Sequence, residues 1–327
     1  AYLQQISCVL RGRLDVQAFE KAWQQVVKRH PVLRTSFIWE GVKETVQVVQ
    51  RHADISLEQQ DWEALAPFRR EDSLEELLAA DRQRGFDLSK APLMRLTLVR
   101  LDSHTHYFVW SHHHLLLDGW SVPLLLKEVF TFYEAARQGQ ELKLPMPRPY
   151  RDYIAWLKKQ DLSAAESYWR ETLRGFTEPT RLDLRRPTTD EPHEYAEQQL
   201  LLSAEATARL QQYARRQQVT VNTLVQGAWA LLLSRYSGRR DVVFGATVSG
   251  RPADLPGAEG MVGLFINTLP VRVQVGGEET IGEWLRGLQR GQVAARQYEY
   301  SPLAEVQRWS EVGRGAGLFE SLIVFEN

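Results

Sequence analysis

The stretch His113-His114-Leu115-Leu116-Leu117-Asp118-Gly119 decides how the fold of this chain is interpreted. It follows the strand-like apolar run Tyr107–Trp110 and precedes an apolar helix predicted from Ser121 to about Gln138. Successive side chains on a strand point to opposite faces, so one imidazole is expected to be held from behind while the other faces a cavity. The Asp-Gly pair predicts a turn with positive φ, and the helix directs its N-terminal amides toward the same place. These groups together indicate a site for acyl transfer.

Two plainer interpretations of the histidines compete with this one. A single histidine beside an apolar strand is usually a core residue, but packing explains a His-His pair followed by Asp-Gly less easily. Zinc binding is disfavoured because consecutive strand residues cannot all face one ion, and no further ligand spacing accompanies His112, His113 and His114. We therefore expect no metal site.

The composition limits the class of protein. The chain has 327 residues, 43% of them hydrophobic and 25% charged, which is long enough for two cores, since single cores usually split beyond about 250–300 residues. The net charge of −1 gives no electrostatic argument for nucleic-acid binding, and no apolar run approaches the ~20 residues of a membrane helix. The single cysteine, Cys8, fits a reducing cytoplasm and is expected to be a small buried hydrophobe.

Hydrophobic periodicity indicates an α+β fold. Helices are predicted over residues 15–30, 73–84, 121–138, 150–173, 204–217, 221–236 and 280–297. Strands are predicted over 2–10, 93–101, 106–112, 197–202, 241–248, 265–273 and 318–326, with a hairpin at 35–39 and 45–49. The proline-containing segment 176–192 predicts a linker between domains at 1–175 and 193–327. The glycines between Gly245 and Gly263 lack the spacing of a phosphate-binding loop, so no nucleotide is expected.

The histidine segment resembles the HHxxxDG motif of the condensation domains of nonribosomal peptide synthetases. Similar motifs occur in chloramphenicol acetyltransferase and its relatives. Four further segments resemble motifs of that family in the same order: Arg29–Phe37 (RHxxLRTxF), Tyr150–Trp156 (YxDYxxW), Val262–Pro270 (GxFxNTLP) and Leu318–Asn327 (the late LF strand). The ordered combination is specific, and it covers nearly the whole chain.

The resemblance implies two chloramphenicol acetyltransferase-like subdomains, each a mixed α/β sandwich. In the family they form a V-shaped pseudodimer with the active site at their junction. Family members usually begin earlier and continue well past the FEN-like end at Phe325–Asn327, so we expect the C-terminal subdomain to be truncated at its C-terminal end.

The implied reaction is aminolysis of a thioester. The amine of an acceptor aminoacyl thioester attacks a donor acyl or peptidyl thioester, giving an amide and a thiol. Both substrates are carried on the phosphopantetheine of partner domains, so the expected partners are donor and acceptor peptidyl carrier domains and an adjacent adenylation domain. No cofactor is expected to be bound by the domain itself. A thioester is already activated, and the chain shows no GxSxG elbow.

The expected site residues fall into three groups. His114 is the candidate for orienting the amine and accepting a proton, and Gly119 for donating its N–H to the oxyanion. His113 is given a structural role. Asp118 could be catalytic, but we favour a buried carboxylate paired with Arg34, the arginine that the resemblance supplies. The remaining candidates would line a substrate tunnel: Trp120, Ser121, Asn267 and Asn327.

The subtype is indicated by three short segments. The sequences of Leu115–Ser121, Glu299–Leu303 and Phe325–Asn327 most resemble the corresponding segments of condensation domains that accept a D-configured donor. Those of domains that act after a polyketide or starter unit are the next most similar. Two other functions stay open: a free-standing acyl-CoA-dependent acyltransferase and a non-catalytic docking module.

Overall fold

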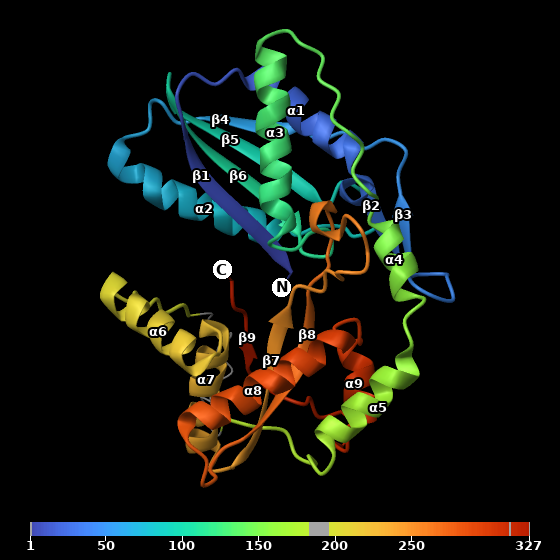
Figure 1. Cartoon of the computed structure of the whole chain (residues 1–327). Helices are drawn as coiled ribbons and strands as arrows, with labels where there is room; N and C mark the ends of the chain where they lie inside the picture. The colour runs from blue at the N-terminus through green and yellow to red at the C-terminus, as the bar shows by residue number, and fades with distance from the viewer. Residues whose placement is uncertain (1, 183–195, 314, 327) are drawn as a thin grey trace. The chain divides into compact units, whose positions relative to one another are not determined.

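The computed structural model describes residues 2–182, 196–313 and 315–326, which form two compact units (Figure 1). The first unit comprises Ala1–Lys158 together with Arg251–Phe265, and the second comprises Lys159–Gly250 together with Ile266–Asn327. This division differs from the expected one at 175 and 193, because the chain returns to the first unit for fifteen residues late in the sequence. The expected linker at 176–192 falls largely outside the described residues.

The first unit is built on a four-stranded mixed sheet. Its spatial order is β1 (Leu3–Arg11), β6 (Thr105–His113), β5 (Met94–Asp102) and β4 (Leu57–Asp61). The pairs β1–β6 and β5–β6 are antiparallel, whereas β4 runs parallel to β5. The strand that leads into the histidine motif is therefore central in the sheet, with its backbone paired on both sides.

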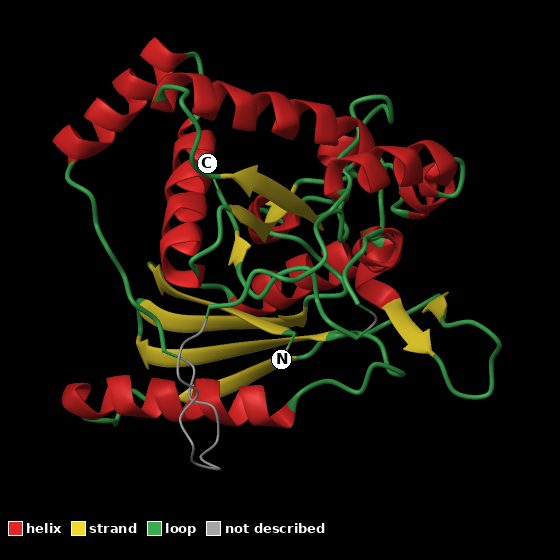
Figure 2. Cartoon of the chain, turned by 90° about the horizontal axis from the view of Figure 1, so that it is seen from below, coloured by secondary structure: helices red, strands yellow, loops and turns green. Residues whose placement is uncertain are grey.

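Helices cover both faces of this sheet (Figure 2). Helices α1 (Val16–Arg29) and α3 (Ser121–Arg137) pack on one face, where the ring centroids of Trp23 from α1 and Trp110 from β6 lie 4.9 Å apart. Apolar residues recur on α1 at helical spacing, and Asp15 caps it by accepting the N–H of Ala18 at 3.0 Å. This face holds the main core of the unit.

Helix α2 (Arg70–Arg84) contacts the opposite face through polar groups. The Asp81 carboxylate accepts from Arg95 Nε of β5 at 2.7 Å and from Gln5 Nε2 of β1 at 2.8 Å. The unit also contains the hairpin β2 (Thr35–Ile38) and β3 (Val46–Val49), helix α4 (Arg151–Leu157) and the 3-10 turns η1 (Pro31–Arg34), η2 (Pro67–Arg69) and η3 (Ala258–Gly260).

The second unit contains a smaller sheet in the order β8 (Asn267–Gln274), β7 (Asp241–Val248) and β9 (Leu322–Ile323). Strand β7 is antiparallel to β8 and parallel to β9. Its helical segments are α5 (Leu162–Leu173), α6 (Ala204–Gln217), α7 (Val221–Ser237), α8 (Ile281–Ala295), η4 (Arg296–Tyr298) and α9 (Leu303–Trp309).

Several predicted elements differ in the structure. Residues 197–202 form no strand, and Leu200 is 85% exposed, because no described strand pairs with this segment. The strand predicted over 318–326 is reduced to β9. Strand β4 was not predicted, because its sequence LEQQD lacks apolar alternation. Cys8 is exposed rather than buried, since it lies on β1 at the edge of its sheet.

Within the described parts of the chain, no helix is both long and apolar enough to cross a membrane.

Candidate active site

The histidine motif lies where the central strand of the first unit ends. Strand β6 ends at His113, and the N–H of Leu116 donates to the His113 carbonyl at 3.0 Å, which closes a turn. His114 is thus in a turn and not on the strand, so the expected alternation of two neighbouring strand residues does not describe this pair. Both imidazoles are half-buried, whereas His112 is buried.

A backbone carbonyl determines which nitrogen of His114 carries its proton. His114 Nδ1 lies 2.8 Å from the carbonyl oxygen of Leu117. A carbonyl oxygen can only accept a hydrogen bond, so Nδ1 is the protonated nitrogen and Nε2 of the neutral ring has a free lone pair. This is the tautomer that a proton-accepting or amine-orienting imidazole requires at Nε2.

His113 has the opposite arrangement. Its Nδ1 accepts the N–H of Leu115 at 3.2 Å, so Nδ1 is unprotonated and Nε2 carries the proton of the neutral ring. Burial lowers the pKa of His113. Burial, together with the nearby His114 and His113, lowers the pKa of His112 to about 4. Burial, the largest of these causes, therefore keeps His112 neutral near pH 7.

Asp118 is a buried anion with a buried cationic partner. Its carboxylate lies 3.1 Å from Arg251 Nη2, with the two side chains 0% and 7% exposed. The carboxylate also accepts the N–H of Phe265 at 3.1 Å and the N–H of Ser121 at 2.9 Å. The guanidinium of Arg251 lies 3.9 Å from the ring centroid of Phe265. These contacts satisfy a charge that would otherwise be costly to bury.

The prediction that Arg34 pairs with Asp118 is wrong. Arg34 instead donates from Nε to the carbonyl of Val27 at 3.2 Å and from Nη1 to the carbonyls of Gln50 and Arg51, so it ties α1 to the end of the β2–β3 hairpin. Sequence analysis missed Arg251, which lies 133 positions from Asp118 and in a segment that was interpreted only as a glycine-containing connection. No local pattern identifies such a partner.

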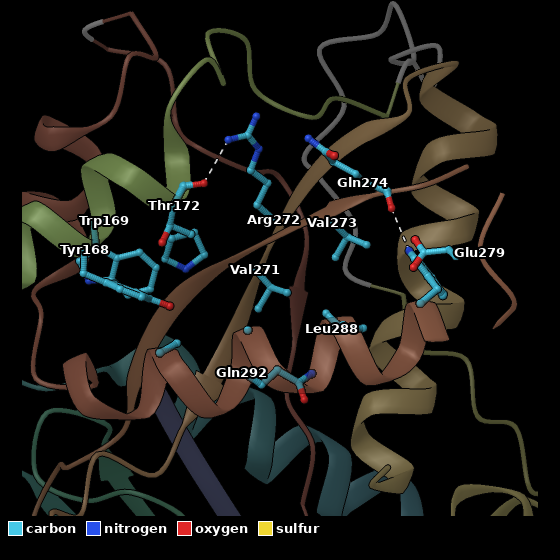
Figure 3. A pocket seen from close by; sticks show the side chains of 15 residues that line it. Tyr168, Trp169, Thr172, Val271, Arg272, Val273, Gln274, Glu279, Leu288 and Gln292 are labelled. Carbon is cyan, nitrogen blue, oxygen red and sulfur yellow. Dashed lines mark hydrogen bonds between the residues drawn. The ribbon is translucent and has the colours of Figure 1, made fainter. Parts of the chain in front are cut away.

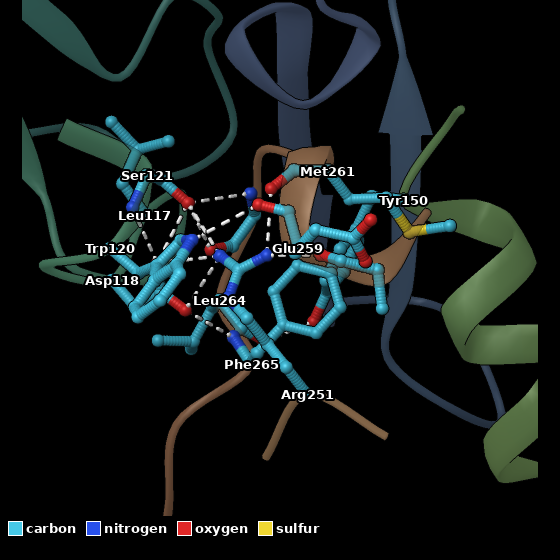
Figure 4. A network of polar contacts seen from close by, with 12 residues as sticks. Leu117, Asp118, Trp120, Ser121, Tyr150, Arg251, Glu259, Met261, Leu264 and Phe265 are labelled. Carbon is cyan, nitrogen blue, oxygen red and sulfur yellow. Dashed lines mark hydrogen bonds and ion pairs between the residues drawn. The ribbon is translucent and has the colours of Figure 1, made fainter. Parts of the chain in front are cut away.

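The segment 251–265 is fixed to the histidine motif by a network of polar contacts (Figure 4). Ser121 Oγ lies 2.7 Å from Asp118 Oδ1 and 3.2 Å from Arg251 Nη2, and it accepts the N–H of Gly263 at 3.1 Å. The Tyr150 hydroxyl donates to the carbonyl of Leu264. Burial is the main cause that raises the pKa of Tyr150, which keeps this donor protonated.

Gly119 and Trp120 are exposed where the motif leads into α3. Gly119 does not have the positive φ expected of the Asp-Gly pair, because the N–H of Ser121 donates to the Asp118 carbonyl at 3.1 Å and the turn leads directly into α3. Trp120 is 56% exposed, and its Nε1–H donates to the carbonyl of Glu259 at 3.0 Å. The indole is thus an exposed surface held in one orientation.

The other expected tunnel residues have different environments. Ser121 is fully buried and engaged on all sides, so its hydroxyl is not available to a substrate. Asn267 lies in the second unit, where its amide donates to the carbonyls of Glu299 at 2.8 Å and Ser301 at 2.7 Å. Asn327 lies outside the described residues.

The second unit has a hollow between α5, β8 and α8 (Figure 3). None of the expected site residues lines it. Arg272 at its rim donates to the Thr172 carbonyl at 3.0 Å and pairs with Asp241 at 2.7 Å, so its charge is already satisfied. No group of three His, Cys, Asp or Glu side chains among the described residues is placed to hold a metal ion.

Comparison with known families settles the class of the chain. The Condensation domain family matches residues 1–327. The chain belongs to the condensation-domain family. Domains of this family form amide bonds, a transferase reaction, in nonribosomal peptide synthetases, where they work with carrier and adenylation domains. The resemblance drawn from the five motifs is confirmed, and so is the fold class.

Individual relatives agree with this assignment. Linear gramicidin synthase subunits C and D of Brevibacillus parabrevis are 53% and 54% identical to the whole of this condensation domain, which spans 4% and 6% of their lengths. Among solved structures, the X-domain of teicoplanin biosynthesis in its complex with OxyB is 27% identical, with a TM-score of 0.80 over 97% of this chain and 70% of that one.

Proposed function

We propose that this chain forms a peptide bond between a carrier-bound donor thioester and the amine of a carrier-bound acceptor aminoacyl thioester. The observation that supports this most directly is the hydrogen bond between His114 Nδ1 and the Leu117 carbonyl, at 2.8 Å. It leaves Nε2 as an acceptor for the attacking amine. Proton transfer by a positioned side chain contributes about 10²–10⁴-fold in rate.

The other residues of the motif have supporting roles in this proposal. Gly119 donates its N–H to the oxyanion of the tetrahedral intermediate, and it is exposed and has no side chain to obstruct the substrate. Asp118 acts through its ion pair with Arg251 and does not touch the reacting atoms. His113 is structural, since its Nδ1 is engaged by the N–H of Leu115.

We further propose that the donor has the D configuration at its reacting residue. This proposal rests on the amino-acid sequences of Leu115–Ser121 and Glu299–Leu303. In the second unit the latter segment is held at two points by the Asn267 amide, which bonds the carbonyls of Glu299 and Ser301. A segment held this firmly is suited to a role in selecting a substrate.

The proposal is tested by incubating the chain with two separately loaded carrier domains, using donors that differ only in D or L configuration. We expect an amide product, formed faster from the D donor, and loss of at least tenfold in turnover in His114→Ala with unchanged carrier binding, a factor equivalent to about 1.4 kcal/mol. Turnover of the variant within tenfold of the parent would refute the role of His114. Activity with CoA thioesters alone would identify a free-standing acyltransferase, and binding without turnover a docking module.

A further inference from the structure

The peptide between Leu117 and Asp118 connects the histidine to the segment 251–265. Its carbonyl oxygen accepts the hydrogen bond from His114 Nδ1 at 2.8 Å. Its N–H, which belongs to Asp118, donates to the carbonyl of Gly263 at 3.2 Å. A peptide group is planar, so the direction of its N–H also sets the direction of its carbonyl. The position of Gly263 therefore helps to determine whether His114 meets an acceptor at Nδ1.

Gly263 has both of its backbone polar atoms within hydrogen-bond distance of one hydroxyl group, whose single proton is shared between the Gly263 carbonyl and the Asp118 carboxylate. The N–H of Gly263 donates to Ser121 Oγ at 3.1 Å, and Ser121 Oγ lies 2.9 Å from the Gly263 carbonyl oxygen. Ser121 is 0% exposed, so water cannot replace either contact without entering the interior. The Ser121 hydroxyl accepts the N–H of Gly263, and its proton lies between the Gly263 carbonyl and the nearer Asp118 carboxylate.

The opposite side of Gly263 is closed by a ring. A Cβ at Gly263 would lie 2.1 Å from Cδ2 of Tyr150, closer than any real contact, so the Tyr150 ring packs directly on the backbone. The Tyr150 hydroxyl is bonded to the neighbouring carbonyl of Leu264. Gly263 is thus enclosed between Ser121 and Tyr150, of which only Ser121 bonds its peptide groups directly.

We propose that Ser121 is a positioning residue that holds His114 in its Nδ1-protonated tautomer. It acts through the Gly263 backbone and the Leu117–Asp118 peptide, and it does not touch the reacting atoms. Without the hydroxyl, Gly263 loses one of the contacts that fix its position, so the Leu117–Asp118 peptide is held less firmly and the hydrogen bond at His114 Nδ1 is weakened. The ring then populates the other tautomer, in which Nε2 carries a proton and cannot accept one. The catalytic part of this inference rests on the proposed function of His114.

The test reads the tautomer and the rate separately. The chain is labelled with ¹⁵N-histidine, and long-range ¹H–¹⁵N spectra are recorded for the parent, Ser121→Ala and Thr223→Val, with His114→Gln to assign the signal. Thr223 is a matched control, because the residue is 0% exposed and its hydroxyl is hydrogen-bonded to Gln292 at 2.8 Å within the second unit. Amide formation from loaded carrier domains is measured in parallel.

We expect the parent and Thr223→Val to show His114 protonated at Nδ1. In Ser121→Ala the Nε2-protonated form should rise, with turnover reduced about tenfold, equivalent to about 1.4 kcal/mol, and KM little changed. Ser121→Cys keeps the size of the side chain with a weaker donor and should be intermediate, and it serves as the test variant if Ser121→Ala does not fold.

Three outcomes would overturn the inference. An unchanged tautomer in Ser121→Ala refutes the positioning role and leaves the proposed function intact. A changed tautomer with unchanged turnover refutes the role of His114 in the proposed function, and with it the catalytic meaning of Ser121. The same tautomer change in Thr223→Val would show that loss of any buried hydroxyl loosens the His114 ring, which refutes a specific positioning role for Ser121.

Discussion

Replacement of Asp118 by alanine should unfold the first unit at a markedly lower temperature. The substitution leaves the Arg251 guanidinium buried without its anion and removes the acceptor of the Phe265 N–H. Removing one partner of a buried ion pair typically costs about 3–5 kcal/mol. Unfolding midpoints of domains of about 150–250 residues fall by roughly 2–4 °C for each kcal/mol, so we expect the midpoint of Asp118→Ala to fall by about 6–20 °C.

Calorimetry of three variants checks this reasoning. Asp118→Ala/Arg251→Met removes both charges, and it should recover much of the loss because an apolar pair often replaces a buried ion pair at little cost. Asp152→Ala is the matched surface control: its carboxylate is 2.9 Å from Arg148 Nε but is 32% exposed, so we expect a change of about 0–1 kcal/mol. An inactive Asp118→Ala protein with an unchanged midpoint would refute the pairing role and favour a catalytic carboxylate.

Three further predictions concern neighbouring residues. Gly263→Ala forces the Tyr150 ring aside and should lower the free energy of unfolding, measured in urea, by about 1–3 kcal/mol. Gly260→Ala is the control, because a Cβ there meets nothing within 4 Å. Equal losses in the two variants would contradict the packing argument. The pKa of His112 is about 4 in the folded chain against an ordinary 6.5, so as the pH falls the unfolded chain binds a proton at this residue before the folded chain does. The free energy of unfolding should therefore drop by about 2 kcal/mol between pH 7 and pH 5, and His112→Phe should lack this drop. Gly119→Ala should fold normally, because Gly119 is exposed and has no positive φ, but lose turnover; a fully active variant would exclude its N–H from the oxyanion site.

Elements with a strong local signal were predicted well. The predicted 204–217 and 241–248 coincide with α6 and β7, because a capping serine starts the one and a continuous apolar run forms the other. Strand β4 has no such signal, since its polar sequence is held by pairing with β5 alone. A strand also requires a pairing partner, and the strand expected at 197–202 is absent because no described strand pairs with this segment.

The candidate site could also be predicted only where the signal is local in the sequence. The histidine motif identifies the location of the site because its residues are consecutive. The partner of Asp118 could not be identified in this way, because Arg251 comes from a segment that returns to the first unit after a long excursion. A buried carboxylate requires a cationic partner, and Arg34 was expected in that role because it lies in the segment that resembles the RHxxLRTxF motif. Only the three-dimensional contacts distinguish the two arginines.

The discontinuity of the first unit has a consequence for synthesis on the ribosome. Residues 1–158 emerge first, but the segment that supplies Arg251 and the N–H of Phe265 follows only after the intervening part of the second unit has been translated. Arg251 lies 133 residues after Asp118, so at about 5–20 residues per second Asp118 waits roughly 7–27 s for its partner. During this interval the nascent first unit contains an uncompensated acidic group that opposes closure of its interior. Completion of the first unit is thereby delayed until most of the second has been made, which links the maturation of two units that could otherwise fold one after the other.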